Sequence, residues 1–259
     1  MDPTRDRGGR AVDVRQPALS IVMPVYNEGD GVEPVLRSLY ERATIRPWEV
    51  LVVYDFDGDS TVPVVRRLQS EMSDIRLHRN ELGPGPMNAL RSGFGAARAP
   101  YVLVMMADGS DDPGDVDRMY ELATSGADVV AASRYMRGGQ QLGGPRLKRL
   151  LSKAAGLSLY WIGGVPTHDS TNNFKLYSRR FLQSVGIESS RGFEVGLELT
   201  VKASWRGLMV RETATTWQDR TVGESHFRLM KWLPAYLRWY WRGLLTRIVR
   251  LRRWSAKSG

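Results

Sequence analysis

The sequence lacks cysteine entirely and has only three histidines among its 259 residues. The absence of cysteine excludes disulfide frameworks, thiol nucleophiles, zinc ribbons and iron–sulfur clusters, and three histidines are too few for a histidine-rich metal site. No uncharged apolar run reaches the roughly 18 residues that a membrane-spanning helix requires. No signal-type apolar segment follows the charges of residues 1–17, so we expect a flexible arm there rather than a secretory signal.

Acidic residues are scarce near the C-terminus. Residues 220–259 hold ten Lys or Arg and one Glu, which accounts for the whole net charge of +9. The hydrophobic fraction of 42% and the charged fraction of 25% are those of an ordinary globular domain. We therefore expect a globular domain at 18–228 and a basic extension at 229–259. A polyanionic partner should meet that extension.

Short apolar runs alternate with amphipathic segments through the first half of the chain. Strands are predicted at 19–24, 48–54, 75–77, 101–106 and 128–132, and helices at 31–42, 60–68, 86–97 and after Pro113. Asp30 is the predicted cap of the first helix, and Ser60 is predicted to open the second. This alternation is typical of βαβ units, which build a mostly parallel sheet covered by helices on both faces. The predicted fold class is therefore α/β.

The second half of the chain has a less regular pattern. A glycine-rich segment at 138–145 is predicted to be a mobile loop, and residues 147–161 a basic amphipathic helix. Strands at 173–177 and 208–215 flank a predicted helix at 193–205.

Polar residues follow several predicted strands, at the edge where parallel sheets bind ligands. Asp55 and Asp108 each come after a buried strand. Asp108 suits a hard divalent cation, Mg²⁺ or Mn²⁺, which would neutralise a diphosphate leaving group. Asp55 is placed to accept hydrogen bonds from a ribose or a base. Asp111 and Asp112 are expected instead to cap the next helix.

An ordered series of motifs runs through residues 19–228. It begins with Ser20-Ile-Val-Met-Pro-Val-Tyr-Asn-Glu28, Val53-Tyr-Asp55, Leu82-Gly-Pro-Gly85 and Met106-Ala-Asp-Gly-Ser-Asp-Asp-Pro113. These motifs resemble glycosyltransferase family 2, whose members share the nucleotide-sugar-binding GT-A fold. Three later motifs are similar to those of the polyprenyl-phosphate (dolichol-phosphate) hexose synthases: Ser133-Arg-Tyr135, Asp169-Ser-Thr-Asn-Asn-Phe-Lys-Leu-Tyr177 and Asp219-Arg-Thr-Val-Gly-Glu-Ser225.

The resemblance implies inverting transfer of a hexose, mannose or glucose, from a GDP- or UDP-hexose to a polyprenyl or dolichyl phosphate. The implied donor-binding residues are Pro24, Tyr26, Glu28, Asp55 and Asp108. Asp108 matches the second aspartate of the family's metal-binding Asp-x-Asp, so Mg²⁺ or Mn²⁺ is the expected cofactor. The implied phosphate-binding residues are Arg134, Arg149 and Arg220, and the implied catalytic residues are Asp108, Arg134 and Arg220.

Three positions depart from the family pattern. Met106 replaces the first aspartate of Asp-x-Asp, His226 replaces a lysine, and Tyr54-Asp-Phe56 replaces Asp-Asp-Gly. The departures indicate a divergent subgroup, in which Asp108 would hold the metal together with diphosphate oxygens and water.

A phosphate monoester acceptor requires different catalytic groups from those that a sugar hydroxyl acceptor requires. Its second pKa is about 6, so near neutral pH it is already a nucleophilic dianion and needs no general base. The site must instead bring two anions together, for which arginine forks and a cation at Asp108 are suited.

Two alternatives to this function remain open. One is a saccharide hydroxyl acceptor with Asp169 as general base. The other is a non-catalytic sugar-nucleotide or lipid-binding module, which Met106 favours. Asp169 and Glu198 also match family positions, and Asp169 is expected to orient the acceptor loop or to make a structural hydrogen bond.

The extension at 229–259 has the pattern of an interfacial helix. Its apolar stripe comprises Leu233, Leu237, Tyr240, Trp241, Leu244, Ile248 and Leu251, and its basic face comprises Arg238, Arg242, Arg250 and Arg253. Trp and Tyr between apolar and cationic groups suit the water–lipid boundary. We expect a peripheral protein on the cytoplasmic face of an anionic membrane, with a separate membrane-anchor subunit as a candidate partner and no nucleic acid. Alternatively, the stripe packs on the protein's own body or on a subunit.

Overall fold

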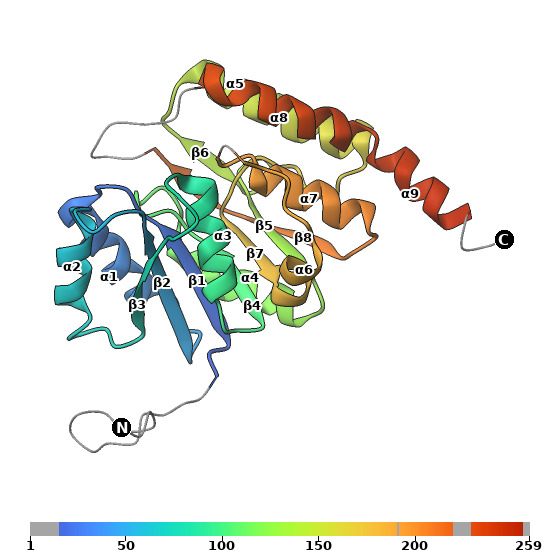
Figure 1. Cartoon of the computed structure of the whole chain (residues 1–259). Coiled ribbons are helices and arrows are strands. Elements are labelled where there is room, and N and C mark those ends of the chain that lie inside the picture. Colours follow the sequence, from blue (N-terminus) through green and yellow to red (C-terminus); the bar gives the residue numbers. More distant parts are fainter. Residues whose placement is uncertain (1–15, 191, 220–228, 256–259) are drawn as a thin grey trace.

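The computed structural model describes residues 16–190, 192–219 and 229–255. Its centre is a seven-stranded sheet in the order β3-β2-β1-β4-β7-β5-β8 (Figure 1). The strands are β1 (Leu19–Pro24), β2 (Trp48–Tyr54), β3 (Ile75–Arg79), β4 (Tyr101–Val104), β5 (Val129–Ser133), β7 (Lys175–Ser178) and β8 (Val210–Ala214). β7 is antiparallel to β4 and β5, and the other pairs are parallel. The predicted α/β fold with a mostly parallel sheet is confirmed.

Helices cover both faces of the sheet, because successive residues of a strand alternate between two cores. Ile21 and Val52 belong to a core shared with α1, α2 and α4, whereas Val22 and Leu51 belong to a core shared with α3, α6 and α7. These helices are α1 (Val32–Arg42), α2 (Thr61–Leu68), α3 (Pro86–Ala96), α4 (Val116–Thr124), α6 (Arg179–Ser184) and α7 (Val195–Trp205). Short 3₁₀ turns, η1 (Gly29–Gly31) and η2 (Pro113–Asp115), precede α1 and α4.

Local structure differs from the prediction at several places. The expected Asp30 cap does not form, because Gly31 rather than Asp30 precedes α1. Ser60 immediately precedes α2, as expected for the residue that opens this helix, but its side chain makes no capping hydrogen bond. Instead, the Asp59 carboxylate accepts the Thr61 amide hydrogen bond at 2.8 Å. The segment predicted as a mobile loop contains β6 (Gln140–Leu142), which pairs in parallel with β9 (Thr216–Gln218). The sequence spacing gave no sign of this pairing because the two strands lie far apart in the chain.

Two helical segments lie together above the sheet (Figure 1). The predicted basic helix at 147–161 consists of α5 (Arg146–Ser158) followed by a π-helical turn, η3 (Leu159–Gly163). The C-terminal segment forms α8 (Leu229–Leu244) and α9 (Thr246–Ser255).

One side of α8 packs on the body of the protein. Trp239 is 1% exposed and shares a small core with Leu159 of η3 and Val201 of α7. Gly243 allows this close approach, because a Cβ there would lie 2.6 Å from Leu159 Cδ2. The alternative that this segment packs on the protein itself therefore holds for part of α8.

The predicted apolar stripe of the extension is divided between two environments. Tyr240 and Leu244 pack against the core around Trp239. Leu237, Trp241 and Ile248 are exposed. The side chains of Leu251 and Arg253 lie outside the described part of the chain. Within that part, no helix combines the length and apolarity needed to cross a membrane.

Glu188 fastens α8 to the loop that precedes α7. Its carboxylate lies 2.7 Å from Arg238 Nη2, 2.8 Å from Arg242 Nη1 and 2.9 Å from Lys202 Nζ. Hydrogen bonds from Lys202 and Arg242 lower the pKa of Glu188 to about 2. Because this pKa is lower in the folded state, the carboxylate stabilises the fold above its unfolded-state pKa of about 4.3, and this contribution is lost as the pH falls toward about 2.

We expect Glu188→Gln to lower the free energy of unfolding by at most about 1 kcal/mol near neutral pH, since solvent screens a side chain that is 41% exposed. The difference from wild type should shrink as the pH is lowered from about 5 to about 3. Urea denaturation at a series of pH values measures both quantities. A difference that stays constant over this range would contradict the assigned ion pairs.

Candidate functional site

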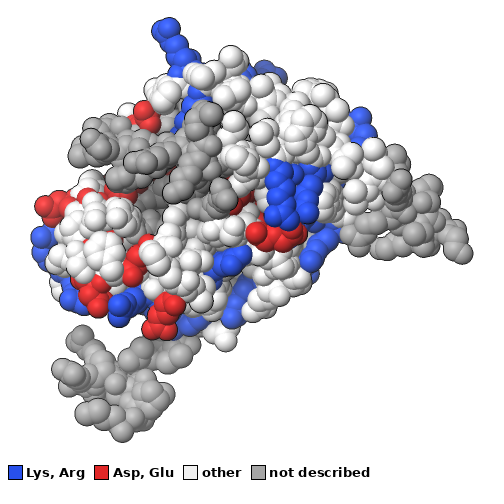
Figure 2. Space-filling model, turned by 45° about the horizontal axis from the view of Figure 1, so that its top comes forward, with Lys and Arg blue, Asp and Glu red and all other residues white. Residues whose placement is uncertain are grey.

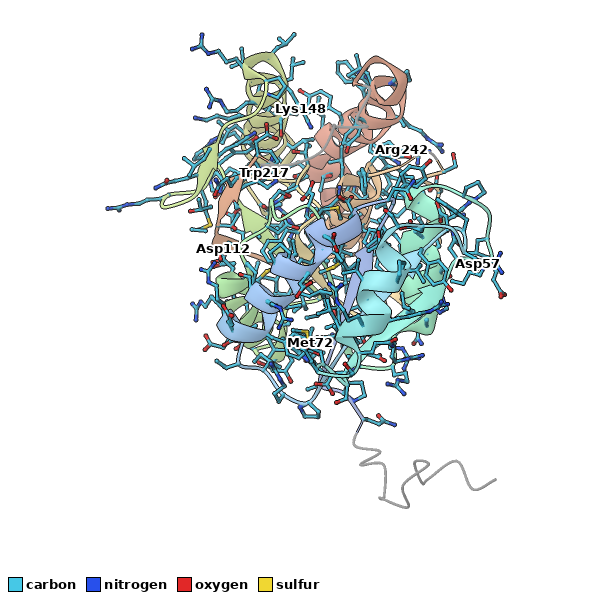
Figure 3. The ribbon with its side chains drawn as sticks, turned by 90° about the vertical axis from the view of Figure 1, so that its left-hand side faces the viewer. Asp57, Met72, Asp112, Lys148, Trp217 and Arg242 are labelled. Carbon is cyan, nitrogen blue, oxygen red and sulfur yellow. The ribbon has the colours of Figure 1, made fainter. Side chains whose placement is uncertain are left out.

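A cavity of about 570 Å³ lies at the end of the sheet where β4 and β5 terminate. Two of its lining residues, Lys148 and Trp217, lie at the end of the molecule opposite to Met72 (Figure 3). Because β7 is antiparallel to β4 and β5, residues 169–173, which precede it, reach the same edge. The cavity continues from this edge into the space between α5, α7 and α8.

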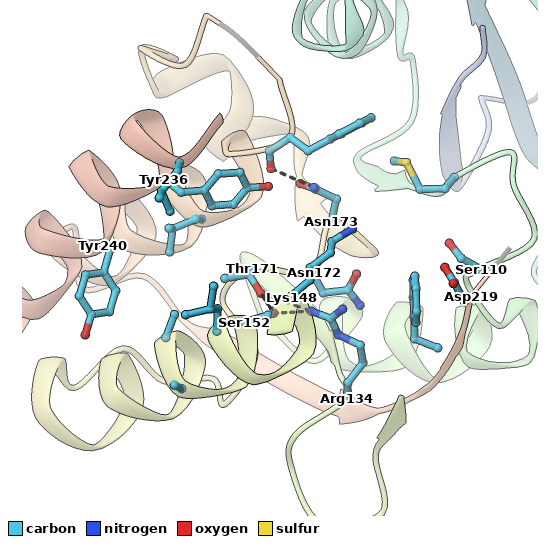
Figure 4. A pocket seen from close by; sticks show the side chains of 18 of the residues that line it. Ser110, Arg134, Lys148, Ser152, Thr171, Asn172, Asn173, Asp219, Tyr236 and Tyr240 are labelled. Carbon is cyan, nitrogen blue, oxygen red and sulfur yellow. Dashed lines mark hydrogen bonds between the residues drawn. The ribbon is translucent and has the colours of Figure 1, made fainter. Parts of the chain in front are cut away.

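The lining of the cavity is polar at one end and apolar at the other (Figure 4). Beside the sheet the lining includes Asp108, Ser110, Asp111, Arg134, Thr171, Asn172, Asn173 and Asp219. Between the helices it includes Leu151, Ala154, Ala155, Leu197, Leu233, Tyr236, Leu237 and Tyr240. Such a cavity suits a ligand with a charged head and a hydrocarbon tail.

Arg134 and Asp169 form a bidentate ion pair in the polar wall. Arg134 Nε donates to Asp169 Oδ2 at 2.7 Å, and Arg134 Nη2 donates to Asp169 Oδ1 at 3.0 Å. The Arg134 side chain is 10% exposed and that of Asp169 is fully buried. The same guanidinium also donates to Ser152 Oγ of α5, at 3.2 Å. The pair thus fixes one guanidinium edge against the loop before β7 and against α5.

Each member of this pair keeps its partner charged. Burial disfavours the ionised form of Asp169, but the charge and hydrogen bonds of Arg134 favour that form more strongly and hold the pKa of Asp169 below its usual value. Burial likewise opposes the charge of Arg134, and Asp169 holds the pKa of Arg134 above its usual value. The predicted structural hydrogen bonding of Asp169 is therefore present. A buried carboxylate whose two oxygens both accept hydrogen bonds from Arg134, and whose pKa is lowered, is poorly suited to take a proton from an acceptor near neutral pH.

Lys175 is a buried charge that the sequence analysis did not select. It begins β7, is fully buried, and donates hydrogen bonds to the carbonyl oxygens of Ser170 and Asn172. Burial lowers the pKa of Lys175 to about 7, although Asp169 opposes this shift. Lys175 thus orders the loop that holds Asp169. A lysine inside the otherwise apolar run Phe174-Lys-Leu-Tyr177 was the available signal.

Asp108 and Asp111 both line the polar end of the cavity. Asp111 is 4% exposed and accepts a hydrogen bond from the Met106 amide at 2.9 Å. Burial, with a contribution from Asp108, raises the pKa of Asp111 to about 7. The expectation that Asp111 caps the next helix is wrong, because its carboxylate turns back toward Met106. Asp112 does act as that cap and accepts from the Gly114 amide at 2.9 Å.

A divalent cation fits beside these carboxylates. Mg²⁺ and Mn²⁺ prefer oxygen ligands, and a cation would offset the cost of ionising the buried Asp111 next to Asp108. Among the described residues no three acidic or histidine side chains are grouped as a metal site. Diphosphate oxygens and water would therefore supply the remaining ligands.

Of the predicted donor residues, Asp108 lines the cavity, whereas Pro24, Tyr26, Glu28 and Asp55 lie along the same edge of the sheet outside it. Pro24 ends β1 and Asp55 follows β2, and these parallel strands lie beside β4. The Asp55 carboxylate accepts hydrogen bonds from Asn80 Nδ2 at 2.7 Å and from the Gly85 amide at 2.8 Å. Asp55 is thus held in place by the loop that begins at the end of β3.

Two further donor residues lie on the loop after β1. Tyr26 is 52% exposed and makes an edge-to-face contact with Phe56, with 5.9 Å between the ring centroids. The Glu28 amide donates to Thr61 Oγ1 at 3.0 Å, so the backbone of this loop is tied to the start of α2.

The predicted phosphate-binding arginines are not all brought together. Arg134 lines the cavity, whereas on α5 it is Lys148, and not Arg149, that does so. The cavity-facing residues of α5 include Lys148, Leu151, Ser152 and Ala155, which have helical spacing and leave position 149 on another side. Arg220 and His226 lie outside the described residues.

Glu198 has a structural position away from the cavity. It is fully buried in α7, accepts hydrogen bonds from the amides of Glu188 and Ser189, and lies 2.6 Å from Lys202 Nζ. Glu198 therefore orders the loop before α7, and its match to a family position has a structural explanation.

Comparison with known proteins gives consistent matches. A curated relative from Mycolicibacterium smegmatis, polyprenol monophosphomannose synthase, is 29% identical over 212 residues, which cover 79% of each chain. An undecaprenyl-phosphate mannosyltransferase from Micrococcus luteus is 28% identical over 79% of this chain and 85% of its own.

Solved structures show the same fold. Glucosyl-3-phosphoglycerate synthase from Mycobacterium tuberculosis, in complex with Mn²⁺, UDP and its product, superposes with a TM-score of 0.62. It is 20% identical, and the match covers 89% of this chain and 80% of that chain. A mannosyltransferase from Pyrobaculum calidifontis in complex with GDP-mannose and Mn²⁺ superposes with a TM-score of 0.60 at 19% identity, over 82% of this chain and 59% of that chain. The predicted GT-A fold is therefore confirmed.

The family follows from the sequence match itself. The model of glycosyl transferase family 2 matches residues 20–186, well over half of the chain. That stretch contains the strand-end residues Asp55, Asp108 and Arg134 as well as the loop before β7. The chain therefore belongs to glycosyl transferase family 2.

Proposed function

We propose that this glycosyltransferase transfers a hexose, mannose or glucose, from a GDP- or UDP-hexose to a polyprenyl phosphate, with inversion at the sugar. The observation that carries the proposal is the cavity whose lining passes from carboxylates and Arg134 to the apolar side chains of α5, α7 and α8. A sugar or a soluble phosphorylated acceptor would have no use for the apolar end. The names of the relatives, which are polyprenyl-phosphate mannosyltransferases, support the same acceptor class.

The polar end is suited to the phosphate head of the acceptor. Arg134 and Lys148 line it and offer cationic donors. Asp169 and the loop ordered by Lys175 hold Arg134 in place, so its guanidinium needs little reorganisation when an anion arrives. The acceptor dianion attacks the anomeric carbon, and the bond between that carbon and the nucleotide diphosphate breaks, with no proton removed from the acceptor.

Asp108 and Asp111 are the proposed metal-binding residues. A bound Mg²⁺ or Mn²⁺ would stabilise the negative charge of the departing diphosphate. Such metals accompany nucleotides in the neighbouring solved structures. Pro24, Tyr26, Glu28 and Asp55 are proposed to contact the nucleoside, because they lie on the same edge of the sheet one and two strands away from Asp108.

Transfer to a saccharide hydroxyl is the less favoured acceptor chemistry. It requires a general base, and the residue expected in that role, Asp169, is fully buried and bound by Arg134. The apolar end of the cavity also has no counterpart in a saccharide. The acceptor proposal further places the protein at the cytoplasmic face of an anionic membrane, where a polyprenyl phosphate would reside, with or without an anchoring partner subunit.

Product analysis tests the acceptor directly. The full chain is incubated with radiolabelled GDP-mannose, UDP-glucose or GDP-glucose, with Mg²⁺ or Mn²⁺, and with either undecaprenyl phosphate or phosphoglycerate. We expect one donor to give label in the organic phase only when the lipid phosphate is present. Label found only in a water-soluble product, with phosphoglycerate or a saccharide, would overturn the proposed acceptor.

A substitution that fills the apolar end of the cavity should weaken the binding of long acceptors more than that of short ones. Ala155 lines this part of the cavity, so Ala155→Phe places a ring where the acceptor tail is proposed to lie. We expect the KM for undecaprenyl phosphate to rise by roughly 10-fold, about 1.4 kcal/mol of binding, and the KM for citronellyl phosphate to change little. Met209→Phe, which adds a ring to an exposed position on the loop before β8, is the control. Equal effects on both acceptors would argue against a tail in this space.

A further inference from the structure

Exposed apolar side chains are concentrated on one face of the molecule. Fourteen large hydrophobic residues are exposed among those the structure describes, and nine of them belong to α5, η3, α8, α9 or the residue between α8 and α9. They are Leu147, Leu150, Leu151, Trp161, Ile162, Leu237, Trp241, Leu245 and Ile248. We call these nine residues the apolar face. Exposed apolar groups gathered in this way mark an interaction surface rather than ordinary scatter.

The elements that carry the apolar face contact one another, although they lie about 80 residues apart in the chain. η3 contacts α5, α8 and α9. Ser158 Oγ at the end of α5 lies 3.0 Å from Tyr240 Oη of α8. Arg247 of α9 donates to the Trp161 carbonyl oxygen at 3.0 Å. These contacts hold the α5–η3 edge and the C-terminal helices in a fixed relation.

The charge around the apolar face is mostly positive, although Glu188 pairs with Arg238 and Arg242 at the side of α8. Residues 145–163 and 229–255 contain no Asp or Glu, whereas α5 alone carries Arg146, Lys148, Arg149 and Lys153. In Figure 2 the upper right of the molecule is largely white with some blue side chains, and most red side chains lie to the left or lower in the view, apart from a red group against a blue group near the centre. A second copy of this chain docked face to face would bring like charges together, which disfavours self-association. An apolar centre with a predominantly basic margin matches an anionic lipid surface.

The apolar face is also where the cavity reaches the surface. Leu151 of α5 and Leu237 of α8 both line the cavity and belong to the apolar face. The apolar end of the cavity therefore meets the surface between the two helices that carry this face. A hydrocarbon chain could pass from a bilayer into the cavity here without crossing water.

We propose that the apolar face is a composite membrane-docking surface, in which Trp161 and Ile162 of η3 insert into the headgroup–acyl boundary beside α8 and α9. The mid-chain α5–η3 edge is then as necessary for docking as the basic C-terminal segment. The acceptor enters the cavity sideways between α5 and α8. The docking surface stands on its own observations, and only this entry route rests on the proposed function.

Vesicle flotation of the full chain tests the docking surface. The variant Trp161→Ser/Ile162→Ser removes two side chains that are 67% and 64% exposed and do not line the cavity. On vesicles of phosphatidylcholine with phosphatidylglycerol we expect its partition coefficient to fall at least 10-fold. The matched control is Leu82→Ser/Met209→Ser, which removes two exposed apolar residues elsewhere and should float like wild type. Truncation before α8 is unsuitable, because it would uncover the core around Trp239.

The outcomes separate docking from catalysis. We expect the η3 variant to keep wild-type transfer to citronellyl phosphate in solution and to lose transfer to undecaprenyl phosphate embedded in vesicles. Unchanged flotation of the η3 variant, or equal loss in the control, would overturn the docking surface. A wild-type dimer that dissociates in the η3 variant, without any vesicle binding, would show a protein interface instead and would also overturn it. Normal docking without transfer to any polyprenyl phosphate would refute the proposed function alone.

Discussion

Asp108→Asn is expected to reduce the turnover of sugar transfer by about 10³-fold, a loss of about 4 kcal/mol of transition-state stabilisation. By the resemblance to the family, Met106 stands where another metal-binding aspartate is usual, so Asp108 is proposed to carry more of the metal's coordination than usual. Asn keeps the size of the side chain and the oxygen that accepts from the Ser110 amide at 3.1 Å, but it removes the charge. Steady-state kinetics with saturating donor and Mn²⁺ measures the loss.

The neighbouring residue Asp112 offers a matched control. Asp112→Asn removes the same charge from the same loop, but Asp112 caps η2 and pairs with Arg42 at 2.7 Å outside the cavity. We expect this variant to keep nearly full activity and to lose no more than about 1 kcal/mol of stability, because Asn is also a good cap. Mn²⁺ titrations followed by thermal stability should show weakened binding in Asp108→Asn only. Equal activity losses in the two variants would contradict the role of Asp108.

Arg134→Met is expected to lower the free energy of unfolding by about 3–5 kcal/mol, the usual cost of leaving one member of a buried ion pair alone. Asp169 would remain fully buried, with Lys175 as its remaining nearby cation. The folded-state pKa of Asp169 should rise, so the penalty should be largest at neutral pH and should diminish in acid, where the carboxyl takes up a proton. Guanidinium denaturation at two pH values measures both effects.

The double variant Arg134→Met/Asp169→Asn identifies the source of this loss. Removing both charges should recover part of the stability, since no uncompensated carboxylate remains. It should not recover transfer, because the cationic donor in the cavity wall is gone. If Asp169→Asn lowers the free energy of unfolding as much in the Arg134→Met background as it does in the wild type, the two residues are not energetically coupled, which would contradict the ion pair.

The alternation of strands and helices in the first half of the chain was predictable because its signals are local. Continuous apolar runs such as Tyr101–Val104 and the amphipathic segments between them reflect burial on both faces of a parallel sheet. The rule that ligands bind at the carboxyl ends of parallel strands then selected Asp55 and Asp108. Both lie on that edge, and Asp108 lines the cavity.

The parts that sequence reasoning missed depend on contacts between distant segments. Nothing local marks β7 as antiparallel, yet this direction brings Asp169 to Arg134. The burial of Lys175 also follows from that packing, whereas the hydrogen bond between Asp111 and the Met106 amide is a local contact that residue type alone did not reveal. Helical spacing identified an apolar stripe in the extension, but not which part of it packs on the body through Trp239. Residue type and spacing therefore indicated where chemistry occurs, whereas tertiary packing decides which side chains take part.

The most direct test of the central claim is to locate the acceptor tail. A polyprenyl phosphate with a photoreactive diazirine in its terminal isoprene unit is irradiated with the full chain and donor nucleotide, and the labelled peptides are identified by mass spectrometry. The account predicts label on α5 and α8, around Leu151 and Leu237, which competes away with unlabelled polyprenyl phosphate. Competable label confined to other parts of the chain, such as the loops that carry Tyr26 and Asp55, would contradict it.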